Sequence, residues 1–333
     1  MDEFDGLSVL PIPRLPVDVV RLLVEVTSAM NNASALALAL SCRRFACWVT
    51  PVIYRSVNLK TIRSVDSFLY ALEHSSQDVR LMVQVLTIDT MAGAYYSQTS
   101  LATTKIITLC INAVTIALWS LKDKDSLLDL SKHKYLRRVS IHMEYFMSDK
   151  ASVLSSLPDS IPNFMFNITH LDLYEFKERV YQRAAILQYL HRLTHLFMVS
   201  ASDEASTLAS HFTPFLPSST KVWIIHFRYY QVSDMKVIDG LAGGQADPRL
   251  VVSMKTTKNS PEMSNAKYII HRVLAQTAET KTIWREWGDP FLQEPDFWEE
   301  AEMIIAQRKA SKNSTACRSH QETAHDDWGE LHW

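Results

Sequence analysis

Residues Leu15 to Tyr54 read LPVDVVRLLVEVTSAMNNASALALALSCRRFACWVTPVIY, and this stretch guides the interpretation of the whole chain. Apolar residues recur at helical spacing after Pro16, which suits the first turn of a helix. The paired asparagines that begin at Asn31 predict the end of this helix. The opening stretch is therefore expected to be a small helical unit.

A second apolar run follows at once and predicts a second helix. Ser34 is a suitable N-cap, and the run continues to Val49, with Pro51 expected to end the helix. Because this helix is apolar on nearly all sides, it must be covered on several of them. We then expect an extended segment from Val52 to Leu59 and a third short helix from Ser64 to His74.

The composition suits a folded chain. Of the 333 residues, 47% are hydrophobic and 21% are charged, and the net charge is −2. Without a basic block the chain is a poor candidate for binding nucleic acid. The acidic, proline-rich start does not resemble a signal peptide, and the apolar run Ile106 to Leu121 is shorter than the roughly 20 residues of a membrane span. We therefore expect a cytoplasmic or nuclear protein with reduced cysteines and no membrane association.

Beyond residue 80, short extended apolar runs recur every 23 to 32 residues. Their average spacing of about 27 residues lies within the range of leucine-rich repeats. Helix-compatible stretches such as Glu178 to Leu190 lie between them, which predicts stacked strand-helix units in an α/β fold. An irregular α/β domain would give the same pattern. The last core position of each run is expected at Ile88, Leu118, Ile141, Leu173, Met198, Ile224 and Val252.

The C-terminal part is predicted to close the stack. Asn265 to Thr280 and Asp296 to Lys309 are compatible with helices. The polar, aperiodic residues that follow predict a disordered tail. The expected division of the chain is a lead-in at 1–14, a helical domain at 15–60, a linker helix at 61–80, a repeat domain with closing helices at 81–309, and the tail at 310–333.

The opening stretch resembles an F-box. The resemblance rests on Leu15-Pro16, on the leucines of the two apolar runs, and on Cys42-Arg43-Arg44-Phe45 with Trp48 after it. More narrowly, it is similar to the basidiomycete-type F-box-like proteins of mushroom-forming fungi, in which the box continues into a segment like Pro51 to Tyr54. Such families join the box to leucine-rich-repeat-like units. The α/β fold expected here is therefore a small F-box-like helical domain followed by an irregular leucine-rich-repeat-like solenoid.

The resemblance implies a substrate receptor of a Skp-cullin-F-box ubiquitin ligase. The box would bind a Skp-type adaptor, and through it a cullin scaffold, while the repeats bind an unknown protein substrate. A unit this small cannot bury so many large apolar groups within itself, which agrees with a partner site. The same residues could instead form a cap on the first repeat, in a binding scaffold with a degenerate box. The adaptor-binding residues implied are Leu15, Pro16, Val19, Leu22, Leu23, Leu36, Leu38 and Trp48.

The sequence offers no pattern of catalytic, cofactor-binding or metal-binding residues. His191 and His195 are four residues apart, but Arg192 stands where a zinc peptidase has its glutamate base. The glycine-rich segment at Gly240 lacks the lysine and hydroxyl of a phosphate-binding loop. We therefore expect a protein that is not an enzyme. A hydrolase or transferase with an unfamiliar site is the remaining alternative.

A target-binding surface is predicted from strand alternation. Residues between the core positions of a strand point to the opposite face, which in a repeat stack is the concave wall. Exposed aromatic residues there would be natural anchors, although flanking loops could bury them instead. The residues nominated by this rule are His142, Asp172, Tyr174, Phe197 and Trp223.

Overall fold

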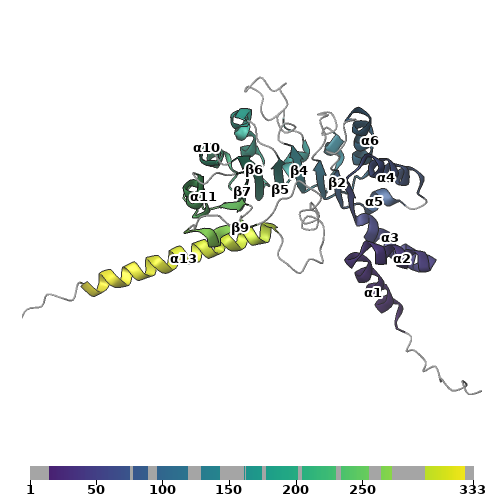
Figure 1. The fold of residues 1–333 in the computed structure, drawn as a ribbon, viewed down its shortest axis with the longest axis horizontal. Coiled ribbons are helices and arrows are strands. Elements are labelled where there is room, and N and C mark those ends of the chain that lie inside the picture. The colour runs from purple at the N-terminus through teal and green to yellow at the C-terminus, as the bar shows by residue number, and fades with distance from the viewer. Residues whose placement is uncertain are drawn as a thin grey trace, which may run out of the picture. The chain divides into compact units, whose positions relative to one another are not determined.

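The fold is described from a computed structural model, shown as a ribbon in Figure 1. It divides into two units, Met1–Ser56 and Val57–Trp333. The residues that the structure describes are 15–75, 78–88, 96–118, 129–142, 161, 163–174, 178–201, 205–229, 234–254, 264–271 and 297–326. The predicted lead-in therefore lies outside the described residues.

The first unit contains three helices: α1 (Val17–Met30), α2 (Asn32–Ser41) and α3 (Arg43–Arg55). The predicted single helix from Ser34 to Val49 is wrong, because Cys42 is extended and separates α2 from α3. The sulfur of Cys42 accepts a hydrogen bond from the Phe45 amide, so this side chain begins a new helix.

Two further boundaries differ from the prediction. Asn31, not Ser34, caps α2, since its side chain accepts from the Ala33 amide at 2.8 Å. Pro51 lies inside α3 and does not end it. The extended segment predicted from Val52 therefore begins only at Ser56.

The core of the first unit is small. Val24, Ala35 and Val49, one from each helix, are its buried residues. Partly buried side chains pack around them: Val20, Leu38, Ala39, Phe45, Trp48 and Ile53. Three helices thus share one narrow core and leave many apolar side chains outside it.

Nine strands of the described chain form one sheet, in chain order, and every pair from β2 to β9 is parallel. Sequential parallel strands require a crossover segment after each strand. The strands are β1 (Ser56–Leu59), β2 (Val85–Ile88), β3 (Thr115–Leu118), β4 (Arg138–His142), β5 (His170–Tyr174), β6 (His195–Ala201), β7 (Val222–Tyr229), β8 (Leu250–Met254) and β9 (Ile269–His271).

The crossovers contain helices of unequal length and type. Glu178 to Leu190, expected to be compatible with a helix, is a 3₁₀-helix up to Tyr189. The predicted linker helix is α4, which packs against α6 as part of the second unit and buries Val65, Phe68 and Leu72. The crossover helices described are α4 (Ile62–His74), α5 (Val79–Met82), α6 (Tyr96–Leu109), η1 (Asp129–Lys132), η3 (Asn163–Asn167), η4 (Glu178–Tyr189), α10 (Ala205–Phe212), η6 (Thr213–Phe215), α11 (Met235–Ala242) and η8 (Ala266–Tyr268).

The strand register follows the predicted core positions with one shift. Ile88, Leu118, Ile141, Leu173 and Met198 are successive cross-strand partners, as the recurrence predicts. The next partner is Ile225, not Ile224, and it pairs in turn with Val252. The prediction for β7 is therefore wrong by one residue, which exchanges the two faces of that strand.

The two faces of β7 are covered by different helices. Trp223 is fully buried and its ring lies near that of Phe212 in α10. Ile224 belongs to the cluster of buried residues that includes Phe297 and Trp298 of α13 (Phe297–Asp326). Adjacent strand residues point to opposite faces, so α10 and α13 lie on opposite sides of the sheet.

The C-terminal helix differs most from the prediction. Asp296 to Lys309 was expected to be helical, but α13 continues to Asp326, so the predicted disordered tail is wrong for 310–326. The predicted helix from Asn265 is wrong where it is described, because that segment is η8 followed by β9. Its remainder, from residue 272, lies outside the described residues.

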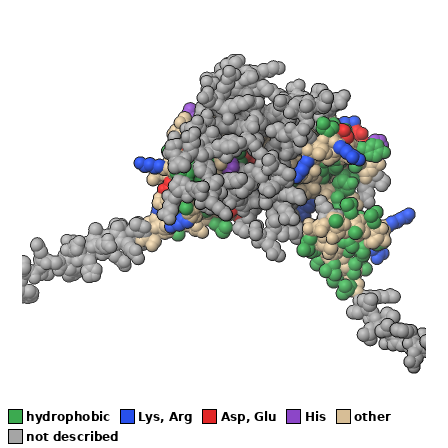
Figure 2. Space-filling model, in the orientation of Figure 1, with side chains coloured by type: hydrophobic (Ala, Val, Ile, Leu, Met, Phe, Trp, Pro, Cys, Tyr) green, Lys and Arg blue, Asp and Glu red, His purple; other side chains and the backbone are tan. Residues whose placement is uncertain are grey.

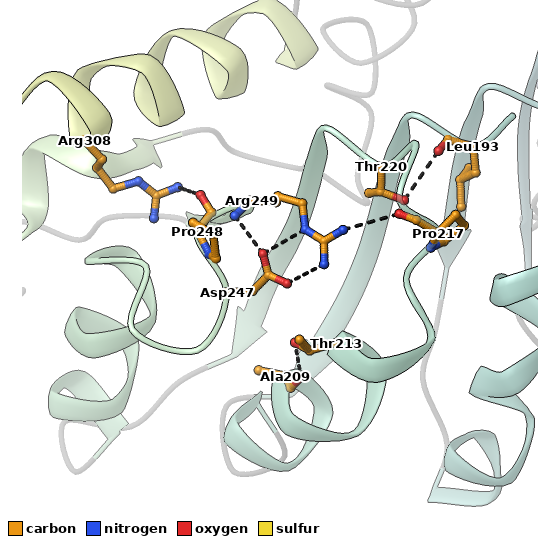
Figure 3. A network of polar contacts seen from close by, with 9 residues as sticks. All are labelled: Leu193, Ala209, Thr213, Pro217, Thr220, Asp247, Pro248, Arg249 and Arg308. Atoms are coloured by element: carbon orange, nitrogen blue, oxygen red, sulfur yellow. Dashed lines mark hydrogen bonds and ion pairs between the residues drawn. The ribbon is translucent and has the colours of Figure 1, made fainter. Parts of the chain in front are cut away.

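A buried arginine of α13, Arg308, contacts the segment before β8, and Figure 3 shows its hydrogen bond to the Pro248 carbonyl. Arg308 donates hydrogen bonds to the carbonyls of Leu250 at 2.6 Å and Ala242 at 3.1 Å. Close to this contact, Asp247 and Arg249 form an ion pair at 2.7 Å in the turn before β8. Burying a guanidinium is costly unless its donors are used, so these contacts fix the position of the helix.

None of the helices within the described ranges combines the length and apolarity that crossing a bilayer requires.

Candidate partner-binding surface and the face beneath α13

The first unit exposes many large apolar side chains to solvent. Leu22 is 60% exposed and Leu40 is 87% exposed. Figure 2 shows hydrophobic side chains gathered over this unit. The large apolar residues exposed on or just before α1 and α2 are Leu15, Val17, Val19, Leu22, Leu23, Met30, Leu36 and Leu40. We call this set the apolar face.

Helical geometry explains how the apolar face arises. In α1, Val20 and Val24 point into the core, whereas Val19 and Leu23 lie one position earlier and remain exposed. In α2, the small residue Ala35 is buried and its neighbour Leu36 is exposed. The fully enclosed positions hold Val and Ala, and larger side chains such as Phe45 and Trp48 are only partly buried, so several leucines remain exposed.

The structure divides the residues nominated for adaptor binding into two groups. Six are exposed: Leu15, Pro16, Val19, Leu22, Leu23 and Leu36. Leu38 and Trp48 are half-buried and pack against the core, with Trp48 stacked on Phe45 at 5.6 Å. The sequence reading missed Val17, Met30 and Leu40, although Leu40 lies one helical turn after Leu36 and follows the same spacing.

The residues nominated for target binding are less accessible than predicted. The expectation of exposure is wrong for Asp172, Phe197 and Trp223, all of which are buried. The ring of Phe197 meets Phe297 of α13 at 5.1 Å, so a helix, not a loop, covers it. Trp223 lies on the opposite face because of the one-residue shift in β7. The side chains of His142 and Tyr174 lie outside the described part of the structure.

Asp172 is an unusual buried carboxyl group. One of its oxygens accepts a hydrogen bond from the Ser140 hydroxyl at 2.7 Å. The other, Oδ1, has no donor among the described residues. Burial raises the pKa of Asp172 to about 7, and the bond from Ser140 opposes this rise only in part. The group can therefore carry a proton near neutral pH.

Two histidines stack on neighbouring strands beneath the start of α13. The rings of His170 and His195 are parallel with centroids 4.2 Å apart, and the edge of Trp298 contacts both. Nε2 of His195 lies 3.2 Å from the Glu302 carboxylate on α13.

This burial favours the neutral imidazoles. Burial lowers the pKa of His170 to about 2, with smaller contributions from His195 and Arg138. It also lowers the pKa of His195, against the opposing effect of Glu302. The described residues contain no group of three or more His, Cys, Asp or Glu side chains placed to hold a metal ion. The stacked pair is thus explained by packing between the sheet and α13.

Comparison with known proteins adds no family to this description. No protein-family model matches the chain, and no curated protein matches it either. The fold and the surface define the class as a mixed α/β protein with a nine-stranded parallel sheet. In addition to the unit that contains the sheet, the chain has a separate three-helix unit with an exposed apolar face.

Proposed function

We propose that this protein is the substrate-recognition subunit of a Skp-cullin-F-box ubiquitin ligase. The N-terminal unit is then an F-box-like domain of the kind found in mushroom-forming fungi. Its apolar face binds a Skp-type adaptor and, through the adaptor, a cullin scaffold. The observation that carries the proposal is the exposure of eight large apolar side chains on or just before α1 and α2.

The balance of buried and exposed groups supports a partner at this face. Among the described residues of the unit, from Leu15 onward, only three apolar residues are buried, so the unit gains little from its own core. An interface of ordinary size removes about 800 Å² from each partner, and its energy is concentrated in a few central side chains. Leu22 and Leu36 are suitable anchors because they come from different helices and are both more than half exposed.

The second unit supports the role of a target receptor. Its strands are parallel, follow chain order and recur at intervals close to the length of a leucine-rich repeat. These features favour the finer interpretation of an irregular leucine-rich-repeat-like solenoid. Such stacks offer an extended surface to a protein ligand without any catalytic group. The protein is then a non-enzymatic receptor in the cytoplasm or nucleus.

Co-purification of the full chain with a Skp-type adaptor tests the proposal. The double variant Leu22→Ser/Leu36→Ser should reduce adaptor recovery strongly, because each anchor residue contributes on the order of 1–2 kcal/mol. The matched control is Tyr70→Ser/Leu101→Ser, which removes two exposed apolar side chains from the second unit. The control should bind as the wild type does. Equal recovery of the wild type and both variants would contradict the proposal, as would no recovery of any, which would favour the scaffold with a degenerate box.

A further inference from the structure

The segments that lead into successive strands form a continuous row along one edge of the sheet. The side-chain amide of Asn112, before β3, donates to the Leu81 carbonyl before β2 at 3.1 Å. The amide of Arg137 donates to Val114 at 2.8 Å, and that of Lys221 donates to Thr194 at 2.8 Å. Parallel strands begin at the same edge, so equivalent residues of neighbouring segments lie about 4.8 Å apart.

Apolar side chains are exposed along the first part of this row. They come from four successive segments, those before β2, β3, β4 and β5. Tyr135 is 58% exposed and Phe166 is 37% exposed. Aliphatic side chains continue the row toward β2, at Leu81, Ile111 and Val114. These residues lie in turns or short helices at the surface, where exposed polar groups are usual, so their number is informative.

Basic side chains begin at the segment before β4, where they flank Tyr135, and continue to the segment before β7. They are Lys134 and Arg137 before β4, Arg192 before β6 and Lys221 before β7. The five residues that precede each strand from β2 to β7 include no Asp or Glu. Arg192 contacts Asn167 of the neighbouring segment at 3.0 Å, and no described carboxylate forms an ion pair with any of the four.

The pattern changes at the next segment. Before β8, Arg249 is paired with the buried Asp247, so its charge is already neutralised. From β2 to β8, the basic residues without a carboxylate partner that directly precede a described strand thus lie before β4, β6 and β7. We call this row of five apolar and four basic side chains the strand-start surface: Leu81, Ile111, Val114, Lys134, Tyr135, Arg137, Phe166, Arg192 and Lys221.

We propose that the strand-start surface binds an acidic protein segment that carries apolar side chains at one end. Charge complementarity selects Asp and Glu opposite the four basic residues. Three of the five apolar residues are aliphatic and cannot stack on nucleobases, which favours a peptide over a nucleic acid. From β2 to β7 the row spans about 24 Å, which an extended segment of about seven residues would cover.

That the strand-start surface binds an acidic peptide does not depend on the proposed function. That this peptide belongs to the ligase target rests on the proposed function. The strand-start surface also lies outside the face covered by α13, since it is formed by the segments before the strands and not by the strands themselves.

Selection from a phage-displayed library of short random peptides, with the full chain as bait, tests the inference. Peptides enriched by the wild type should combine acidic with apolar residues. They should bind the charge-reversal variant Lys134→Glu/Lys221→Glu about tenfold more weakly, and high salt should weaken their binding to the wild type. The matched control, Lys236→Glu/Lys309→Glu, makes the same change of net charge at exposed positions of α11 and α13 and should bind normally.

Three results would overturn the inference: no enrichment, enriched peptides without acidic residues, or equal binding of these peptides to both charge variants. Binding of a labelled oligothymidine to the wild type and to the two charge variants tests whether the surface binds nucleic acid. If the oligothymidine binds the wild type and loses affinity only in Lys134→Glu/Lys221→Glu, the surface binds nucleic acid instead. The Leu22→Ser/Leu36→Ser variant should retain peptide binding, which separates this test from that of the proposed function.

Discussion

Mild acid should destabilise the second unit through the stacked histidines. The unfolded chain binds a proton at His170 with an ordinary pKa of about 6.5, whereas burial lowers that pKa to about 2 in the fold. Because the folded pKa is the lower one, the stabilising contribution of His170 is present above pH 6.5 or so and is lost as the pH falls toward about 2. The charged groups that face the pair are Arg138, Lys221 and Glu302.

The size of the effect follows from the displacement of the pKa. Each pH unit below the unfolded pKa costs about 1.4 kcal/mol for a group that stays neutral in the fold. Between about pH 7 and about pH 5, His170 therefore removes up to about 2 kcal/mol from the free energy of unfolding. His195 contributes in the same direction but less, because the Glu302 carboxylate offsets the burial.

Urea unfolding followed by circular dichroism at the two pH values measures this loss. The variant His170→Gln does not titrate, and its side chain can still accept a hydrogen bond from the hydroxyl of Thr169, which lies 2.9 Å from Nδ1 of His170. The loss of stability between the two pH values should shrink by up to about 2 kcal/mol in this variant. The control His191→Gln, an exposed histidine before β6, should leave the loss unchanged. If His170→Gln loses as much stability in acid as the wild type, the neutral buried imidazole is not the cause.

Three further changes test how the second unit is held together. Arg308→Ala leaves the carbonyls of Leu250 and Ala242 without their donor and should lower the free energy of unfolding by about 2–3 kcal/mol; an unchanged urea midpoint would contradict this. Gly244→Ala should cost about 1–3 kcal/mol, because Gly244 has a φ of 72° and a Cβ there would lie 2.7 Å from Arg308. This cost should be smaller in the Arg308→Ala background, and strict additivity of the two changes in urea unfolding would refute the contact. Asp172→Asn removes a carboxyl whose pKa is raised in the fold, so the stability of the variant relative to the wild type should increase as the pH rises from about 4 to about 7; a constant difference would show that Asp172 is not buried as described.

The strands could be predicted from the sequence because their pattern is local. Each run from Ile88 to Met198 is a short apolar segment, and the structure pairs the last core residues of these runs in register. The register of β7 could not be predicted. Trp223, Ile224 and Ile225 are all fully buried because helices cover both faces of the strand, so alternation carries no information there.

The helix boundaries and α13 depend on interactions that the apolar pattern does not contain. The second apolar run is continuous in sequence, and only the Cys42 cap divides it. The polar residues after Lys309 predict disorder, yet they continue α13, whose first turns contact the sheet through Trp298 and Arg308. The burial of Phe197 follows from that anchoring. The apolar face was predictable because the number of leucines in α1 and α2 exceeds what a three-helix core can bury.

The central claim is that the apolar face is a binding surface for a Skp-type adaptor. Isothermal titration calorimetry of the full chain with that adaptor, repeated at several temperatures, tests it most directly. We expect a one-to-one complex with a negative heat-capacity change, because binding removes the exposed leucines of α1 and α2 from water. Absence of binding, or binding that the Leu22→Ser/Leu36→Ser variant retains in full, would contradict the claim.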